Sequence, residues 1–360
     1  MRPTKTLQQL LAVLPLIVIS LLAASSRADN APQQPEMDVP AIILDADICS
    51  STDDLFALEM LYHYANQQKC TLLGVVVDRE GEDNTAFADV MNTYFGYGNV
   101  PIGLVRHGVS QPQVWIDYAH IAHLKDAQER PLFQRTVSDY STLPDGWQLY
   151  RQLLAQQKDH SVSIVSTGFV TCLAQLLQSS ADEYSPLNGV ELVRRKVKCI
   201  YMQGGVFGDA EEPDFNFQQA SAFSHEFFRL WPQDVDMVFS PMEVGQAVDY
   251  LPEQVISDIS WTDIHPIKLV YEKCNCDTGQ RMWDVMPVIQ AVEGDGQFLL
   301  SERGTVTLTP ECSTLFTPSS TGNCRYQKAG DDTWAAQILG KLREINLHHH
   351  RALEESGITK

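Results

Sequence analysis

The sequence predicts an α/β fold in which a mostly parallel sheet is covered by helices on both faces, with a small antiparallel hairpin near the C-terminus. Short apolar runs typical of buried strands alternate along the chain with longer segments of helical periodicity. The runs are continuously apolar and do not alternate with polar residues, which is typical of strands covered on both faces. Together these observations indicate a three-layer, Rossmann-like arrangement.

The expected elements follow in order from residue 41. Buried strands are predicted at 41–44, 71–77, 100–105, 162–165, 199–202 and 235–239. Helices are predicted at 55–61, 83–95 and 147–157, from 171 onward and in the segment that ends at 231. The stretch 106–145 reads as irregular, which in α/β enzymes is often a lid or substrate loop. Its His120 and His123 could supply an acid, although isolated histidines are more often surface or packing residues. The hairpin is expected at 297–309 and 314–326, and a last helix at about 333–345.

The first residues have the features of a secretory signal peptide. Arg2 and Lys5 give a positive start, residues 10–22 form an apolar core, and residues 26–28 provide a plausible cleavage site. The alternative is a membrane anchor, but the apolar core is interrupted by Pro15 and is short for a bilayer span. We therefore expect a secreted or periplasmic protein with a signal peptide at 1–28, a flexible tether at 29–39, one catalytic-type domain at 40–347 and a polar tail at 348–360.

The chain is strongly acidic, with 26 Lys and Arg against 46 Asp and Glu and a net charge of −20. Removal of the signal peptide takes away basic residues and no acid, so the remaining chain is more acidic still. This charge argues against nucleic acid and against anionic membranes as partners. The eight cysteines could form disulfides in an oxidising compartment, and Cys312 with Cys324 is the favoured pair because the two flank a turn-rich segment.

Carboxylates cluster around the end of the first predicted strand. Asp45 and Asp47 follow the apolar run, and Asp53 and Asp54 open the helix after a short loop. An N-cap role for Asp53 and the helix dipole at Asp54 explain the second pair but not the first. Acids crowded at a strand end are tolerated when a cation binds there, and the hard cations calcium and magnesium suit carboxylate ligands. The sequence therefore predicts a metal site at this edge of the sheet.

This opening resembles the inosine-uridine-preferring nucleoside hydrolase family, whose signature is an apolar strand, D-x-D, a short loop, D-D and an apolar helix. Further segments resemble the family in the same order, so that the similarity spans roughly residues 41–340. These are the strand end Val165-Ser166-Thr167-Gly168, the glycine pair in Met202-Gln203-Gly204-Gly205, the clamp-like Asp214-Phe215-Asn216, and Gly330-Asp331-Asp332 before the last helix.

The resemblance implies a calcium-dependent hydrolase that splits the N-glycosidic bond of a nucleoside into ribose and base. Asp47 would be a calcium ligand and the base that activates the attacking water. Asp54, the carbonyl of Thr167 and the carboxylate of Asp331 would complete the calcium ligands from the protein. Nearby carboxylates suit this chemistry because the reaction passes through a state that resembles an oxocarbenium ion.

The resemblance also implies that Asp53 and Asn216 hold ribose hydroxyls, with Asp214 in place of the family's glutamate. The partner would be a small nucleoside or related N-glycoside, and a homo-oligomer is allowed. Two departures affect the substrate contacts more than the metal ligands. The loop 48–52 lacks the family's glycine, and Gly330 stands where the family has a histidine.

Two alternatives stay open. One is a non-catalytic secreted binding protein on the same fold, which the altered loop and the missing histidine would explain. The other is a phosphatase of the haloacid dehalogenase type, with magnesium as the metal and Asp45 as the nucleophile. That alternative leaves Asp53 and Asp54 without a role. Its other residues would be Asp47, Thr167, Lys196 or Lys198, and the pair Asp331-Asp332.

Overall fold

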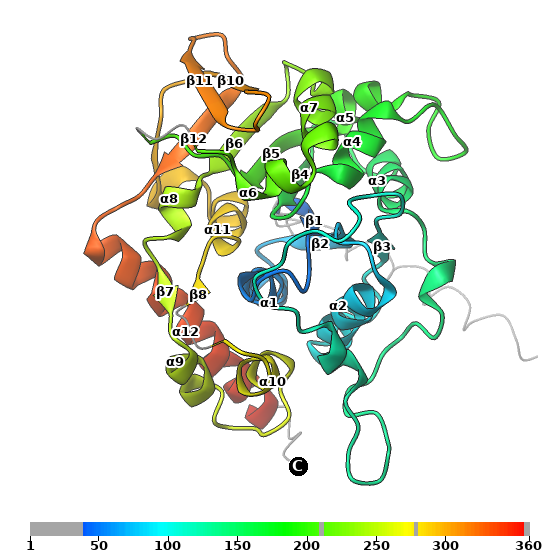
Figure 1. The fold of residues 1–360 in the computed structure, drawn as a ribbon, viewed down its shortest axis with the longest axis vertical. Coiled ribbons are helices and arrows are strands. Elements are labelled where there is room, and N and C mark those ends of the chain that lie inside the picture. The colour runs from blue at the N-terminus through cyan, green and yellow to red at the C-terminus, as the bar shows by residue number, and fades with distance from the viewer. Residues whose placement is uncertain (1–38, 209–211, 277–279, 356–360) are drawn as a thin grey trace, which may run out of the picture. The chain divides into compact units, whose positions relative to one another are not determined.

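The computed structural model describes residues 39–208, 212–276 and 280–355, which form the sheet and helices of Figure 1. The predicted signal peptide and all of the tether except Val39 lie outside the described residues. The first strands are β1 (Ala41–Ala46), β2 (Thr71–Val77), β3 (Ile102–Leu104), β4 (Val162–Ser166), β5 (Val197–Gln203) and β6 (Asp236–Ser240). The later strands are β7 (Asp249–Tyr250), β8 (Gln280–Arg281), β9 (Leu299–Leu300), β10 (Gly304–Leu308), β11 (Thr314–Pro318) and β12 (Cys324–Lys328).

One ten-stranded sheet runs through the molecule in the order β11-β10-β12-β6-β5-β4-β1-β2-β3, and β9 pairs with β12. The strands from β12 to β3 are parallel, whereas β10 pairs antiparallel with β11 and β12. The predicted α/β class, with antiparallel strands near the C-terminus, is therefore confirmed. The second hairpin segment contains two strands, and β12 joins the hairpin to the main sheet through β6.

Helices cover both faces of the sheet (Figure 1). The side chains of β1 alternate between two buried apolar clusters, because successive residues of a strand point to opposite faces. Ile42 and Leu44 join the cluster that contains α1, α2, α10, α11 and α12, whereas Ile43 joins the cluster of α3, α4, α5 and α7. The first group is α1 (Asp53–Asn66), α2 (Glu82–Tyr94), α10 (Pro266–Lys273), α11 (Val285–Glu293) and α12 (Asp332–Glu355). The second is α3 (Gly146–Ala155), α4 (Thr171–Gln178), α5 (Gly189–Lys196) and α7 (Ser221–Leu230).

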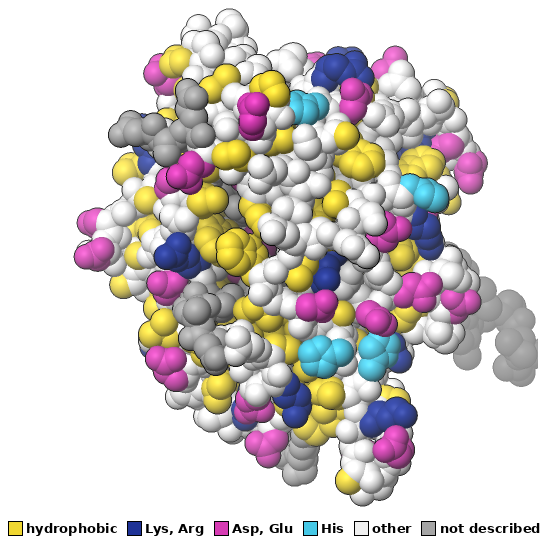
Figure 2. Space-filling model, viewed as in Figure 1, with side chains coloured by type: hydrophobic (Ala, Val, Ile, Leu, Met, Phe, Trp, Pro, Cys, Tyr) yellow, Lys and Arg dark blue, Asp and Glu magenta, His cyan; other side chains and the backbone are white. Residues whose placement is uncertain are grey.

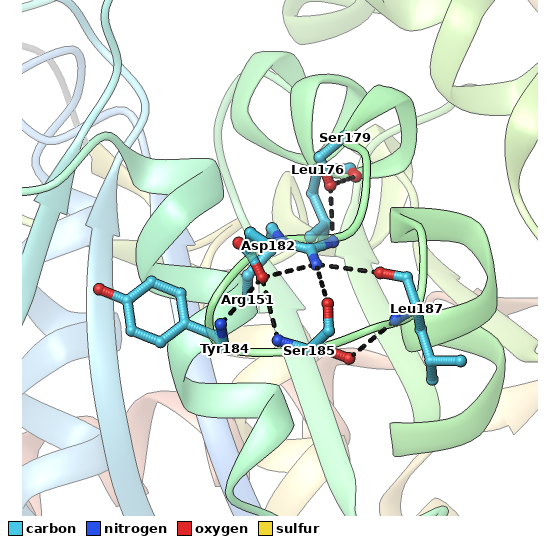
Figure 3. A network of polar contacts seen from close by, with 7 residues as sticks. All are labelled: Arg151, Leu176, Ser179, Asp182, Tyr184, Ser185 and Leu187. Atoms are coloured by element: carbon cyan, nitrogen blue, oxygen red, sulfur yellow. Dashed lines mark hydrogen bonds and ion pairs between the residues drawn. The ribbon is translucent and has the colours of Figure 1, made fainter.

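A buried arginine holds the connection between α4 and α5 in the second layer (Figure 3). Arg151 of α3 forms two hydrogen bonds with the carboxylate of Asp182, at 2.5 and 2.8 Å. Its guanidinium also donates to the Ser179 hydroxyl and to the carbonyls of Ser185 and Leu187. The hydrogen bond from Arg151 lowers the pKa of Asp182. Because these hydrogen bonds compensate the buried charge, Arg151 fixes this loop in place.

Several expectations about the remaining elements are corrected. The region from 242 to 293 contains elements that we did not predict, namely α8 (Met242–Gly245), α9 (Pro252–Asp258), α10, α11 and the small β7–β8 sheet. The last helix continues to Glu355, so most of the predicted polar tail is helical. Cys312 and Cys324 are not bonded to each other; their sulfurs contact Ser221 and Met237 respectively.

The face of the molecule shown in Figure 2 has no extended basic patch. On the face shown in Figure 2, Lys and Arg side chains are scattered singly among acidic ones. Among the described residues, no helix combines the length and the apolar character that a bilayer crossing requires.

Candidate active site

A cavity opens at the carboxyl ends of β1, β4, β5 and β6. This is the edge at which open parallel sheets place their sites. Its wall combines carboxylates, hydroxyls, amides and aromatic rings. The lining residues are Asp47, Ser50, Ser51, Asp53, Trp115, Thr167, Gln203, Asp214, Phe215, Asn216, Met242, Trp283 and Asp284.

Asp47 and Thr167 come together because the ends of β1 and β4 are neighbours. The backbone nitrogen of Thr167 donates to the carbonyl of Asp45 at 2.7 Å. A Cβ at Gly168 would collide with the backbone nitrogen of Asp47, so glycine is needed for this close approach. Burial raises the pKa of Asp47 to about 7, against the lowering effect of a hydrogen bond from Ser50. The sequence-predicted base therefore lies in the cavity wall, only 4% exposed.

Asp54 lies beside the carboxyl group of Asp284. It is fully buried, and no donor with hydrogen-bond geometry reaches either of its oxygens. Burial, followed by the negative charges of Asp47 and Asp53, raises its pKa well above the usual range. A buried carboxylate without donors fits a cation ligand, because a hard cation would replace the missing hydrogen bonds. Within the described ranges, no group of three or more His, Cys, Asp or Glu side chains has the geometry to hold a metal ion.

The expected position of Asp331 is wrong, and Asp284 is found in the cavity instead. Asp331 is exposed and accepts a hydrogen bond from the backbone nitrogen of Trp334 at 2.9 Å, which caps α12. Asp284 precedes α11, which packs against α1 (Figure 1) and so brings this carboxylate to the acid cluster. Burial, then the charges of Asp53, Asp54 and Asp47, raises the pKa of Asp284.

Asp53 connects the loop before α1 to the turn before α11. Its Oδ2 accepts hydrogen bonds from the backbone nitrogens of Trp283 and Asp284, at 3.0 and 3.1 Å. Its Oδ1 accepts one from the Ser51 hydroxyl. The carboxylate that we expected to hold a ribose hydroxyl thus anchors the turn that carries Asp284.

Asp214 is likewise occupied by the backbone. Its Oδ1 accepts from the Phe217 nitrogen at 2.9 Å, which caps the short helix α6 (Phe215–Gln219), and its Oδ2 accepts from the Gly205 nitrogen at 2.8 Å. Burial raises the pKa of Asp214 to about 6. Asp214 therefore positions α6, which presents Asn216 to the cavity. Asn216 in turn donates from Nδ2 to the Thr167 carbonyl at 3.1 Å.

Aromatic side chains line the more open part of the cavity. Trp115 is 67% exposed, and its ring centre lies 5.6 Å from that of Phe215. The backbone nitrogen of Trp115 donates to the carbonyl of Ser50, so the irregular segment 106–145 packs on the loop of the acid cluster. The predicted acid candidates of that segment do not line the cavity, and His123 contacts Asp83 instead.

Sequence reasoning missed Gln203, Met242, Trp283 and Asp284 as cavity residues. One signal was available for Asp284: an acid directly before the apolar helical segment 285–293, the same pattern that marked Asp54 before α1. Gln203 lies in the family-like segment 202–205, of which only the glycine pair was noted, whereas Met242 and Trp283 carried no signal, because their roles depend on which strand and helix ends are neighbours.

Comparison with known proteins shows which solved structures share this fold. No protein-family model matches the sequence, and no curated protein matches it. The inosine-uridine preferring nucleoside hydrolase from Bacillus anthracis is 14% identical, with a TM-score of 0.62 over 85% of this chain and 100% of that one. The purine-preferring ribonucleoside hydrolase from Gardnerella vaginalis is 13% identical, with a TM-score of 0.58 over 85% and 99%. The type III effector XopQ, solved with adenosine diphosphate ribose, is 13% identical, with a TM-score of 0.61 over 86% and 95%. The chain therefore has the nucleoside hydrolase fold that its motifs predicted.

Proposed function

We propose that this protein is a calcium-dependent hydrolase of N-glycosidic bonds, which converts a nucleoside and water into ribose and free base. The observation that supports the proposal is a cavity lined by Asp47, Thr167 and Asp284, with the buried carboxylate of Asp54 close to both aspartates. These oxygen donors would hold the calcium ion. The fold of the structural neighbours supports the same reaction class.

The residues of the chain suit the steps of this reaction. Asp47 would accept a proton from the attacking water, whose oxygen bonds to the anomeric carbon as the carbon–nitrogen bond breaks. The electron pair of the broken bond goes to the leaving nucleobase, which takes up a proton from solvent, and the sugar passes through a positively charged state. The carboxylates of Asp53 and Asp284 would stabilise that charge at short range. A bound calcium ion would supply a Lewis acid that orients oxygen groups in the cavity.

A neutral nucleoside suits the cavity better than a phosphorylated one. Four aspartates line it, whereas no Lys or Arg is among the described lining residues. A phosphate group would therefore meet repulsion from these carboxylates without a compensating Lys or Arg side chain. The aromatic pair Trp115 and Phe215 offers an apolar surface to a flat base.

The position of Asp45 argues against the phosphatase alternative, in which this residue would be the nucleophile. Asp45 accepts a hydrogen bond from the Tyr150 hydroxyl at 2.8 Å on the α3 side of the sheet, and it does not line the cavity. Lys196 and Lys198 lie at the start of β5, at the opposite end of that strand from the cavity residue Gln203. The non-catalytic binding protein remains the competing reading, and the metal experiment below separates the two.

We also propose that the protein is secreted or periplasmic, which rests on the signal-like residues 1–28 alone. Fractionation of the producing cells, with N-terminal sequencing of the purified chain, checks this: recovery from the cytoplasm with an intact N-terminus contradicts it.

Removal of the metal is expected to lower both stability and activity. Calcium at a hundredfold excess over its dissociation constant should stabilise the folded protein by about 2.7 kcal/mol relative to protein in EDTA. Thermal melts in EDTA, calcium and magnesium measure this effect, and release of reducing sugar from a panel of nucleosides measures turnover. Calcium stabilisation without sugar release would favour the binding protein. Magnesium dependence with phosphate release from phosphoesters would revive the phosphatase.

The corrected ligand assignment gives a paired test. Asp284→Asn should weaken calcium binding at least about tenfold, because it removes a charge from the cluster. Asp331→Asn, the matched control, should bind calcium as the wild type does, because Asp331 is exposed at the start of α12. Calcium titrations followed by melting temperature measure both. Equal loss in the two variants, or loss only in Asp331→Asn, contradicts the assignment.

A further inference from the structure

We propose that Gln203 binds the substrate, donating a hydrogen bond from its Nε2 to a hydroxyl group of the sugar. The inference deepens the proposed function, on which it rests for the presence of a sugar in the cavity. Gln203 is the last residue of β5, lines the cavity and is only 9% exposed. Its backbone pairs with that of Ser240 in β6, and this pairing fixes the position of the Gln203 Cα.

Hydrogen bonds determine which end of the Gln203 amide faces the cavity. The Thr167 carbonyl can only accept, so the Asn216 atom 3.1 Å away must be the donor nitrogen Nδ2. The same nitrogen lies 2.8 Å from Gln203, so the atom of Gln203 that it meets must be the acceptor Oε1. The Nε2 of Gln203 is therefore turned away from Asn216. It donates to no group among the described residues, although the side chain is nine-tenths buried.

The surroundings indicate what accepts this hydrogen bond. Both hydrogens of the Asn216 Nδ2 are used, so Asn216 can offer only its Oδ1 to a ligand. A hydroxyl both accepts and donates, so it complements the Gln203 donor and the Asn216 acceptor together. A phosphate or carboxylate would accept from Gln203 but would be repelled by the nearby carboxylates of Asp47 and Asp284. The complementary ligand group is therefore an uncharged hydroxyl, which the sugar of the proposed substrate would supply.

Substitution of Gln203 tests the contact with two readouts. Gln203→Ala should raise KM for a nucleoside, and weaken binding of D-ribose measured by calorimetry, by about tenfold each. Gln203→Glu should not recover this loss, because a carboxylate cannot donate and the hydroxyl would then lie between two acceptors. Recovery of the loss in Gln203→Glu would contradict the assigned direction of the hydrogen bond. Gln218→Ala, an exposed glutamine on α6, is the matched control and should leave both values unchanged.

Nucleosides that lack one hydroxyl identify the atom that Gln203 contacts. The 2′-, 3′- and 5′-deoxynucleosides are compared in wild type and in Gln203→Ala, as in a double-mutant cycle. For the nucleoside without the contacted hydroxyl, the alanine variant should cause no further loss.

Each result decides the inference. Unchanged KM and unchanged ribose affinity in Gln203→Ala overturn it, and so does a wild type that neither cleaves nucleosides nor binds ribose. An equal alanine effect on all three deoxynucleosides also overturns it. Ribose binding that depends on Gln203, without nucleoside cleavage, supports the contact while the proposed hydrolase function fails.

Discussion

Replacement of Asp47 by asparagine is expected to lower the rate of nucleoside hydrolysis about 10²–10⁴-fold while the protein stays folded. Asparagine keeps an oxygen that can approach a cation but cannot accept a proton from water. The side chain has nearly the same volume, and Asp47 lies in the cavity wall, where a neutral amide is tolerated. The loss should therefore appear in kcat with the calcium content of the protein retained.

The measurement combines sugar release with the metal content of the purified variant. Asp331→Asn serves as the control, because it removes an acid of the same type from an exposed position outside the cavity. Hydrolysis by Asp47→Asn at the wild-type rate would rule out Asp47 as the base. Loss of calcium together with activity would assign Asp47 to metal binding and leave the base to be found.

The parallel sheet could be predicted because its strands are apolar on both faces. The segment 71–77, rich in Leu and Val, coincides with β2, and the run at 41–44 lies within β1. Much of the segment after β6 was not predicted, because α8 and α9 are short and the two-residue strands carry no periodicity, although the apolar segment of α11 did carry a helical signal. That segment delivers Asp284, so the ligand was missed together with the elements around it.

The site could be predicted only as far as local sequence defines it. Asp47 and Thr167 follow directly from the ends of two buried strands, and the structure places both in the cavity. The expected convergence of Asp331 rested on similarity of a short acidic motif, and that residue instead caps α12. Asp53 is at the predicted position, but its hydrogen bonds to the backbone of residues 283 and 284 depend on a contact between distant helices. One sequence does not reveal such partners.

A buried glutamate in α1 should make the protein less stable as the pH rises. Glu59 is 2% exposed, and burial raises its pKa to about 8 from the usual 4.5. One terminal atom of the Asn346 side-chain amide lies 3.1 and 3.3 Å from the two carboxyl oxygens of Glu59. The opposite end of that amide contacts the Tyr250 hydroxyl, which donates to Asp258 at 2.8 Å. A protonated Glu59 can donate to the Asn346 oxygen. Each donor in this series of hydrogen bonds, from Glu59 to Asp258, then meets an acceptor.

The sign of the pH dependence follows from the raised pKa. Between pH 4.5 and 8 the unfolded chain releases the Glu59 proton and the folded protein keeps it, so unfolding becomes more favourable as pH rises. Glu59→Gln removes this effect, because glutamine stays neutral and can donate to Asn346. The variant should equal the wild type at pH 4 and be more stable by up to about 3 kcal/mol at pH 7.

Urea unfolding of both proteins at several pH values between 4 and 8 measures the difference, in which the contributions of the other buried acids cancel. Glu302→Gln, an exposed glutamate outside the helices, is the control and should follow the wild-type curve at every pH. Parallel curves for Glu59→Gln and wild type would show that Glu59 titrates alike in both states. Lower stability of the variant at pH 7 would show that the glutamate is ionised in the folded protein and held there by Asn346.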